Sequence, residues 1–353
     1  RGMAIVYDDS DLVTYMESAT HVTPDRPVYL DAFLEDAIEL DVDALCDTEE
    51  CYVGSVLEHI EECGIHSGDS ACCWPPFSLS EKIVDQIRAI TKKLALACGI
   101  RGLLNIQYAV RDEHVFVIEL NPRASRTVPF SSKATGVSLA KYASRIMAGE
   151  KISELRAQGL LPDENRTVDY YAVKEAVMPW SRFPGADSIL GPEMKSTGEV
   201  MGIARTFPAA YAKTREAVEN KLPEQGSVFI SVCDRDKRAI APVAMALENL
   251  GYGIYTTGGT AKTLRAAGID CTTVNRISDG HPNVVDLMRD KTVSFIINTP
   301  HGHEAHSDGA RMRAEAVSQG ITCVTAMSAA TALIQALAAA RKSEPETFAL
   351  QDL

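Results

Sequence analysis

Alternating apolar and acidic residues dominate the first third of the chain. Ile38–Leu45 alternates in this way, which is typical of a strand with one face buried, and Tyr52–Glu58 is a second strand candidate. Ala4–Tyr7 also reads as a strand. Ser78–Glu81 has the form of a capping box, apolar residues at helical spacing follow it, and Gly99 is a natural stop. We therefore expect an amphipathic helix between these two signals.

Two further strands, Leu103–Val110 and Val115–Leu120, flank a short polar turn. The length of this turn matters, because a slip of one residue moves every side chain to the other face. A turn of three or five residues places Gln107, Glu119 and Asn121 on one face, whereas a turn of four residues does not.

The pattern changes near Gly226. Residues 161–225 are rich in proline and contain a helix-like run from Ala209 to Asn220. From Ser227 onward, strands alternate with helical patterns, which predicts a small parallel α/β domain. The expected strands of this domain are Val228–Val232, Gly253–Thr256, Cys271–Val274, Val293–Ile297 and Thr322–Val324.

Composition narrows the class of protein. The 353 residues are 46% apolar, enough for about two domains with buried cores. A net charge of -13 argues against nonspecific DNA binding. Nine cysteines without a Cys-x-x-Cys motif argue against a zinc site and favour free thiols in a reducing cytosol. Because no apolar run reaches the roughly 18 residues of a membrane span and no signal peptide opens the chain, we expect a cytoplasmic protein.

Residues with oxygen ligands, and two arginines, lie in or near the predicted strands Leu103–Val110 and Val115–Leu120. Gln107, Glu119 and Asn121 offer one carboxylate and two amide oxygens, which are ligands that hard divalent cations prefer. Arg123 and Arg126 follow closely, and guanidinium groups clamp phosphate. Glu119 alone would be an ordinary solvated strand end, but the whole set favours a metal and phosphate site.

Two glycine-containing segments favour ligand binding by backbone. Gly64–Ser70 interleaves glycine with Ser, His and Asp, although a lone loop of this kind is weak evidence. Tyr255–Thr260 follows a strand and opens a helix, so its hydroxyl groups, backbone N–H groups and helix N-terminus are the parts of an anion site, although one Thr-Gly turn alone is more often an ordinary βα turn. Lys237 and Arg276 add positive charge, and Asn298 ends a strand at the same sheet edge.

Long motifs resemble the second, carbamate-phosphorylating half of the carbamoyl-phosphate synthase large subunit. These motifs are His59–Glu61, Gly64–Ser70, Glu119–Phe130 and Leu190–Gly202, and the similarity runs nearly from end to end. The resemblance implies a fold of α/β and α+β class: a partial ATP-grasp lobe with a mixed or antiparallel sheet and helices, then a small parallel-sheet domain like methylglyoxal synthase.

The resemblance also implies a domain division. Residues 1–160 are the C-terminal part of the ATP-grasp carbamoyl-phosphate module, residues 161–225 complete it as a connecting region, and residues 226–353 form the methylglyoxal-synthase-like allosteric domain. The small domain lacks the paired acidic and Gly-Gly-Asp signals of methylglyoxal synthase itself, so we reject that activity.

Family roles follow position by position. The positions that match the ATP site are Leu34, Glu39, Gly64, Ile65, His66, Ser67, Gln107 and Glu119. Those that match magnesium or manganese ligands are Gln107, Glu119 and Asn121, and those with a catalytic match are Arg126, Glu119 and Asn121. Positions that match binding of UMP or IMP are Lys237, Thr257, Thr260, Arg276 and Asn298. Positions that match an ornithine site are His59, Glu61, Asp69, Glu175 and Thr325. Potassium is a further candidate cofactor.

Two positions depart from the family. Pro300 stands where Thr is frequent after the Asn-Thr pair, and Arg276 stands where Lys is common. Both changes keep an anion site but leave the identity of the effector open.

The resemblance finally implies a place in a larger assembly. The chain opens at Arg1 like the middle of a longer protein, so we expect it to need the N-terminal part of the large subunit and a glutaminase small subunit, and to be inactive alone. A homo-oligomer is a further candidate assembly. The implied role is carbamoyl phosphate formation for pyrimidine and arginine biosynthesis. The alternatives are a non-catalytic nucleotide-sensing module and another ATP-grasp ligase, and the Thr257–Thr260 turn speaks against the latter.

Overall fold

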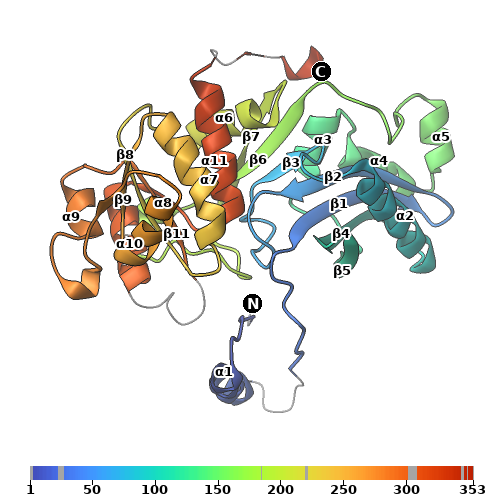
Figure 1. Cartoon of the computed structure of the whole chain (residues 1–353). Helices are drawn as coiled ribbons and strands as arrows, with labels where there is room; N and C mark the ends of the chain where they lie inside the picture. The colour runs from blue at the N-terminus through green and yellow to red at the C-terminus, as the bar shows by residue number, and fades with distance from the viewer. Residues whose placement is uncertain are drawn as a thin grey trace.

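The chain folds around two separate sheets, as the computed structural model shows (Figure 1). The structure describes residues 3–22, 28–183, 185–218, 222–300, 308–342, 346–347 and 349–352. The first sheet has seven strands in the order β5-β4-β1-β2-β3-β6-β7, and all of its neighbouring pairs are antiparallel. Its strands are β1 (Ile38–Asp47), β2 (Cys51–His59), β3 (Cys72–Trp74), β4 (Arg101–Arg111), β5 (His114–Asn121), β6 (Tyr171–Val177) and β7 (Gly198–Ala204).

Helices cover both faces of the first sheet. On one face, Ile83, Val84 and Ile87 of α2 (Glu81–Ala97) pack on Leu40 and Val42 of β1. On the other face, α3 (Val128–Thr135), α4 (Leu139–Met147) and α5 (Ile152–Ala157) contribute to an apolar cluster that includes Leu45 of β1 and Tyr52 of β2.

The second sheet is parallel throughout, with the order β10-β9-β8-β11-β12, which confirms the predicted parallel α/β region. Its strands are β8 (Ser227–Val232), β9 (Gly253–Thr256), β10 (Thr272–Thr273), β11 (Phe295–Thr299) and β12 (Thr322–Val324). The helices around it are α7 (Lys237–Asn249), α8 (Gly258–Ala266), α9 (Val284–Arg289), α10 (Asp308–Gln319) and α11 (Met327–Ala340). Among the described residues, short helices also form at η1 (Trp180–Arg182), between β6 and β7, and at η2 (Ile277–Asp279) and η4 (Leu350–Asp352).

Two helices join the halves. Helix α6 (Phe207–Ala217) and α11 lie side by side between the sheets (Figure 1), and small side chains of both share one buried cluster with the first sheet. Ala329, Ala332 and Ala336 of α11 are in that cluster with Ala210 of α6. Since alanine allows helices to approach closely, this contact buries backbone as well as side chains. Helix α6 begins two residues before the predicted helical run and ends at Ala217, and residues 219–220 of that run lie outside the described residues.

Three local predictions were wrong. Ala4–Tyr7 forms no strand. Instead the helix α1 (Asp9–Val22) follows, and its first turn is held by a hydrogen bond from Asp11 N to Asp8 Oδ1 (2.9 Å). The capping box at Ser78–Glu81 does not form, because Ser78 N (3.0 Å) and its hydroxyl donate to the buried Glu58 instead.

The third error concerns β1, whose two faces are both buried. The alternating acidic residues Glu39, Asp41 and Asp43 are only 5%, 1% and 0% exposed. The alternation in β1 therefore separates a buried apolar face from a buried polar face, and neither face is exposed to solvent.

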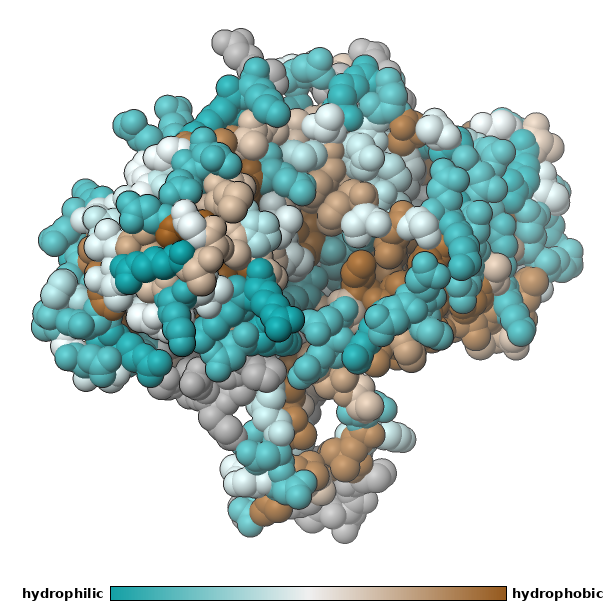
Figure 2. All heavy atoms as spheres, viewed as in Figure 1, coloured by the Kyte–Doolittle hydropathy of each residue, from teal (hydrophilic) through white to brown (hydrophobic). Residues whose placement is uncertain are grey.

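The segment that links α1 to β1 carries exposed apolar side chains, visible below the main body (Figure 2). Tyr29 and Leu30 are 88% and 64% exposed. Within the described part of the chain, none of the helices has the length and apolar character needed to cross a membrane.

Candidate functional site

A β-bulge sets the register of the β4–β5 hairpin. The turn has two residues, Asp112 and Glu113, and their φ values of 49° and 61° suit a type I′ turn. Pairing is regular from the turn as far as Tyr108 opposite Val117, and it would next place Gln107 opposite Ile118. The register shifts at this point, and Gln107 pairs with Glu119 instead.

The bulge therefore aligns polar side chains across three strands. Gln107 lies opposite Glu119 on one side and opposite Asp41 of β1 on the other. Directly opposed residues of antiparallel strands share a face, so these three side chains form a row.

A second row runs beside the first. Asn105 lies opposite Asn121 on β5 and opposite Asp43 on β1. Sequence reasoning predicted Gln107, Glu119 and Asn121 but missed Asp41, Asp43 and Asn105. The acidic alternation of β1 was the available signal.

The predicted metal ligands lie at the more solvent-exposed side of these rows, toward the edge strand β5. Glu119 is exposed, and Gln107 and Asn121 are half-buried. Asn121 Oδ1 accepts a hydrogen bond from Arg123 (3.2 Å). One carboxylate and two amide oxygens on one face suit Mg²⁺ or Mn²⁺, which keep phosphate or water oxygens as further ligands. Within the described ranges, His, Cys, Asp and Glu side chains form no metal-binding group of three or more.

Asp43 anchors the segment that carries Arg126. Its carboxylate accepts hydrogen bonds from Ser125 (2.6 Å), Thr127 (2.7 Å) and Ser131 (2.9 Å). Burial raises the pKa of Asp43 above its usual range, although these hydroxyl groups oppose the shift. Arg126 itself is exposed and contacts Met194, so its guanidinium stands at the surface between two fixed hydroxyl residues.

His59 and Asp41 form a buried pair next to these rows. His59 Nε2 lies 2.9 Å from Asp41 Oδ2, and His59 Nδ1 lies 4.0 Å from Glu39. Burial disfavours the charged form of both groups, but the hydrogen bond and charge attraction between them outweigh it. The pKa of His59 is therefore raised and the pKa of Asp41 is lowered. The pair is thus held in its ionised form.

The predicted nucleotide loop is fixed from several sides. Gly64 N donates to Glu39 (3.1 Å), and a side chain at Gly64 would begin 2.5 Å from the ring of Phe33, next to the predicted Leu34. His66 Nδ1 accepts from Gly68 N (2.9 Å).

The buried Lys174, another residue that sequence reasoning missed, holds the far side of this loop. It donates to the carbonyl oxygen of Ser67 (3.1 Å). The structure thus brings Glu39 and the loop that contains Ile65 together. Leu34 is half-buried beside Phe33.

The predicted ornithine positions form a second polar cluster. Burial beside the Glu175 carboxylate raises the pKa of Glu61 to about 7. Glu175 also pairs with Arg215, which sequence reasoning missed. Among the described side chains, His59 Nδ1, Ser70 Oγ and Glu175 Oε2 are buried polar atoms without a hydrogen-bond partner. Such atoms are costly, and a bound cation or polar ligand would satisfy them.

Two other members of the predicted ornithine set have different surroundings. Asp69 accepts hydrogen bonds from Lys195 N (2.8 Å) and Ser196 N (2.9 Å), so its carboxylate holds a loop. Thr325 is half-buried, and its neighbour Ala326 shares an apolar cluster with Ile60 and Ala71. Thr325 thus lies where the second sheet meets the loop after β2.

The predicted effector positions gather at the carboxyl edge of the second sheet. Thr257 precedes α8, and its hydroxyl lies 3.5 Å from Ser231 Oγ. The Lys237 ammonium lies 3.5 Å from the point where a side chain at Gly259 would begin. Thr260 is buried and accepts from Val232 N (3.4 Å).

Asn298 and Arg276 extend this edge. Asn298 Nδ2 donates to the carbonyl oxygen of Ser231 (3.0 Å), which ties β11 to β8. Arg276 is exposed at the start of η2, and none of the contacts described for it joins it to the α8 turn. The structure therefore brings together four of the five predicted effector positions.

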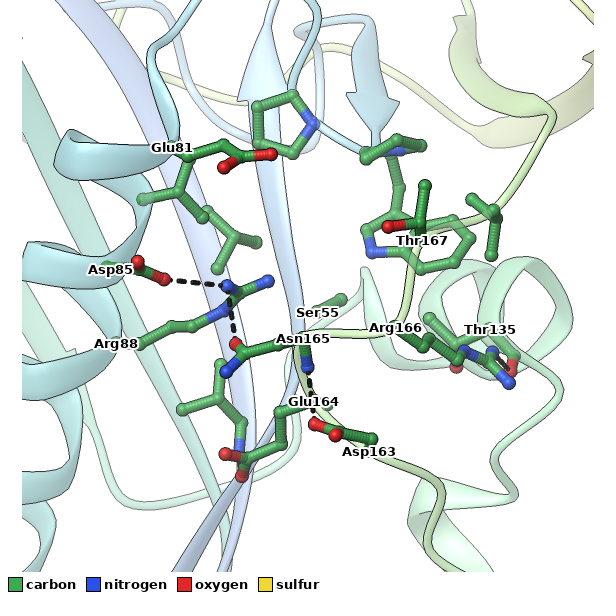
Figure 3. A pocket seen from close by; sticks show the side chains of 18 of the residues that line it. Ser55, Glu81, Asp85, Arg88, Thr135, Asp163, Glu164, Asn165, Arg166 and Thr167 are labelled. Carbon is green, nitrogen blue, oxygen red and sulfur yellow. Dashed lines mark hydrogen bonds and ion pairs between the residues drawn. The ribbon is translucent and has the colours of Figure 1, made fainter.

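A cavity of about 430 Å³ lies elsewhere, between α2, the open part of β2 and residues 163–168 (Figure 3). Arg88 reaches across it to Asn165 (2.9 Å) and also pairs with Asp85 of the same helix (3.1 Å), and Glu164 accepts a hydrogen bond from Val53 N (2.7 Å). None of the predicted site residues lines this cavity. Arg88 pairs with Asp85, whereas Glu164 pairs with Lys92 outside the lining.

Two domain families match the chain. The family described as carbamoyl-phosphate synthase L chain, ATP binding domain, matches residues 1–155, and the MGS-like domain matches residues 239–325. The protein thus joins an ATP-binding domain of the carbamoyl-phosphate synthase L chain type to an MGS-like domain. Among solved structures, the biotin carboxylase–β-γ-ATP complex from Campylobacter jejuni is similar over 62% of this chain and 54% of that chain, with a TM-score of 0.46 and 16% identity.

Curated relatives align along the whole chain. The carbamoyl phosphate synthase large chain of Renibacterium salmoninarum is 48% identical over 374 residues, which cover 100% of this chain and 34% of that protein. The carbamoyl phosphate synthase large chain, C-terminal section, of Aquifex aeolicus is 45% identical, and the match covers 98% of this chain and 66% of that protein. The chain belongs to the carbamoyl-phosphate synthase large-chain family, which confirms the resemblance. It spans about a third of the length of the first of these relatives.

Proposed function

We propose that this chain is part of a carbamoyl-phosphate synthase large subunit that transfers phosphate from ATP to carbamate, giving carbamoyl phosphate. The observation that carries the proposal is the bulged hairpin, which aligns Gln107 and Glu119 in one row and Asn121 in the next. A bound Mg²⁺ or Mn²⁺ would neutralise phosphate charge and align the group in transfer.

The chain's own residues would position the nucleotide. Glu39 fixes the backbone of Gly64, and the 64–67 loop would then lie against ATP, with Leu34 and Glu39 near the adenosine. Arg126, held between Ser125 and Thr127, would contact phosphate as a planar cation.

We also propose that residues 226–353 are an effector domain for UMP or IMP, and that residues 1–160 and 161–225 make up the ATP-binding part. Lys237, Thr257, Thr260 and Asn298 supply an ammonium, hydroxyl groups and an amide around the start of α8, which suits a phosphate. Arg276 would reach the ligand from the neighbouring loop.

A cation site between the halves is the third proposal. Glu61 and Glu175, whose Oε2 has no hydrogen-bond partner, suit an ammonium group of ornithine or a potassium ion, and the protonated Nδ1 of His59 would donate to the carboxylate of ornithine. Asp69 and Thr325 would border this site. The Arg215 guanidinium already pairs with Glu175, so an incoming cation competes with it.

Wider assignments follow from the family. We propose a glutaminase small subunit as partner, a cytoplasmic location, and a role in pyrimidine and arginine biosynthesis. We also propose that this chain alone is inactive, because Glu119 and Arg126 are exposed, and phosphoryl transfer needs a site that excludes water.

The test compares the chain and the complete large subunit with its glutaminase partner, by carbamoyl phosphate formation. Glu119→Gln should lower the activity of the complete enzyme about tenfold or more. The matched control is Glu113→Gln, since Glu113 is exposed in the turn of the same hairpin. Equal activity of both variants would refute the metal-ligand role, and turnover by the chain alone would refute its inactivity.

A further inference from the structure

A fully buried arginine lies beside the proposed effector pocket. Arg313 of α10 is 0% exposed. Its Nη1 donates to Asn298 Oδ1 (3.0 Å), and Asn298 is one of the proposed effector residues. A buried guanidinium requires charged or hydrogen-bonding partners, so its position is fixed by the groups that surround it.

The second partner of Arg313 belongs to the other half of the molecule. Asp187, from the loop between β6 and β7, accepts a two-pronged contact from Arg313 Nε (2.6 Å) and Nη2 (2.7 Å). Bidentate pairs of this kind fix geometry as well as charge. Asp187 and Arg313 are 126 residues apart in sequence, so this pair ties the β6–β7 loop to the second sheet.

The same loop holds the proposed nucleotide loop. His66 N donates to the carbonyl oxygen of Gly191 (2.8 Å). Asp69 accepts from Lys195 N (2.8 Å), and Ser196 Oγ donates to the carbonyl oxygen of Gly68 (2.9 Å). Residues 187–196 therefore contact Arg313 at one end and residues 66–69 at the other.

Space around the guanidinium is tight. A side chain added at Gly309 would begin 2.9 Å from Arg313 Nη1 and 3.5 Å from Asn298 Oδ1. A shift of Asn298 is therefore passed to Arg313, because the surrounding packing leaves the guanidinium little room to absorb it.

We propose that Arg313 is a positioning residue that couples the effector pocket to the nucleotide loop through Asp187 and the 187–196 segment. This inference rests on the proposed effector function of the small domain. Nucleotide bound at Asn298 reorients the Arg313 guanidinium. Because Arg313 holds Asp187, this reorientation shifts the 187–196 segment, and with it the Gly191 carbonyl oxygen that accepts the hydrogen bond from His66 N.

The experiment measures hydrogen exchange of peptides that cover residues 64–70 in the whole chain, with and without UMP or IMP, while calorimetry reports nucleotide binding. The variants are Asp187→Asn and Arg313→Lys, and Gly309→Ala crowds the guanidinium without removing charge. Arg289→Gln is the control, since it breaks an exposed ion pair with Glu315 on the same helix α10.

We expect nucleotide to slow exchange at 64–70 about fivefold or more in the wild type and the control. Asp187→Asn should bind nucleotide but lose that slowing. If nucleotide slows exchange at 64–70 in Asp187→Asn and Arg313→Lys as much as in the wild type, the coupling is overturned and the effector site stands. The same conclusion follows if nucleotide binds the wild type but slows exchange only in the second sheet.

If neither nucleotide binds, the proposed effector function fails, and a ligand-free comparison decides on the coupling. Asn298→Ala should then speed exchange at 64–70 in the wild-type background but not in Asp187→Asn. The same effect in both backgrounds, or no effect in either, overturns the role of Arg313.

Discussion

Gln107 on β4 lies directly opposite Glu119 on β5, although the two-residue turn between the strands would pair Gln107 with Ile118. The bulge supplies the one-residue correction that an even-numbered turn requires. This relationship gives a direct test of the metal site by changes in strand length.

Deleting Ile118 alone should preserve metal binding, because regular pairing then places Glu119 opposite Gln107. Deleting Val117 and Ile118 together should move Glu119 opposite Tyr108, on the other face, and lower Mn²⁺ affinity about tenfold or more. Electron paramagnetic resonance of Mn²⁺ with ADP measures both. Loss of binding in the single deletion would contradict the register explanation.

Asp43→Ala should destabilise the protein by roughly 3 kcal/mol, because buried hydroxyl and amide donors lose their shared acceptor. Asp43→Asn should cost less, since its amide oxygen still accepts. Urea denaturation measures the free energy of unfolding. Asp85→Ala, which breaks a surface pair with Arg88, is the control and should change stability by less than about 1 kcal/mol. Similar losses in both alanine variants would contradict the anchoring role of Asp43.

Glu61 should make stability depend on pH. Its folded pKa of about 7 lies above the usual value of 4.5, so its contribution is fully present below pH 4.5 and is lost as pH rises through 7. Glu61→Gln should remove this dependence and stabilise the protein at pH 8, relative to pH 4.5, by at most about 3 kcal/mol. Thermal unfolding across this range, with Glu113→Gln as control, is the measurement. Parallel pH curves for wild type and Glu61→Gln would rule out the raised pKa.

Thr260→Ala should weaken binding of UMP or IMP by about tenfold if the hydroxyl contacts phosphate. Thr260→Ser keeps the hydroxyl and should bind like the wild type. Calorimetry distinguishes the two, and circular dichroism checks that the loss of the contact with Val232 N leaves the fold unchanged. Unchanged affinity in the alanine variant would remove Thr260 from the site.

Local patterns predicted much of the fold. Thr322–Val324 forms β12 as predicted, and the helix that ends before Gly99 was found from its apolar spacing. Predicted β11 is displaced by two residues, because β strands without a turn signal have poorly defined ends. Long motifs also identified the family, since they preserve the order of residues as well as the residue types.

The rest depends on contacts between distant segments. The acids of β1 are buried by distant segments, Asp43 by Thr127 and Ser131, and Asp41 and Glu39 by His59 and the loop at Gly64, which no pattern within β1 indicates. The bulge depends on pairing between two strands. The Arg313–Asp187 pair joins residues with no local relationship in the sequence.

The alanine contact between α6 and α11 has a consequence for the covalent chain. The polypeptide passes from the first half to the second near Glu224, while α11 returns to pack on α6. A single proteolytic cut after Glu224 should therefore leave two fragments that migrate together in gel filtration and separate only in denaturant. The contact between α6 and α11 would then hold the two halves together without the covalent connection.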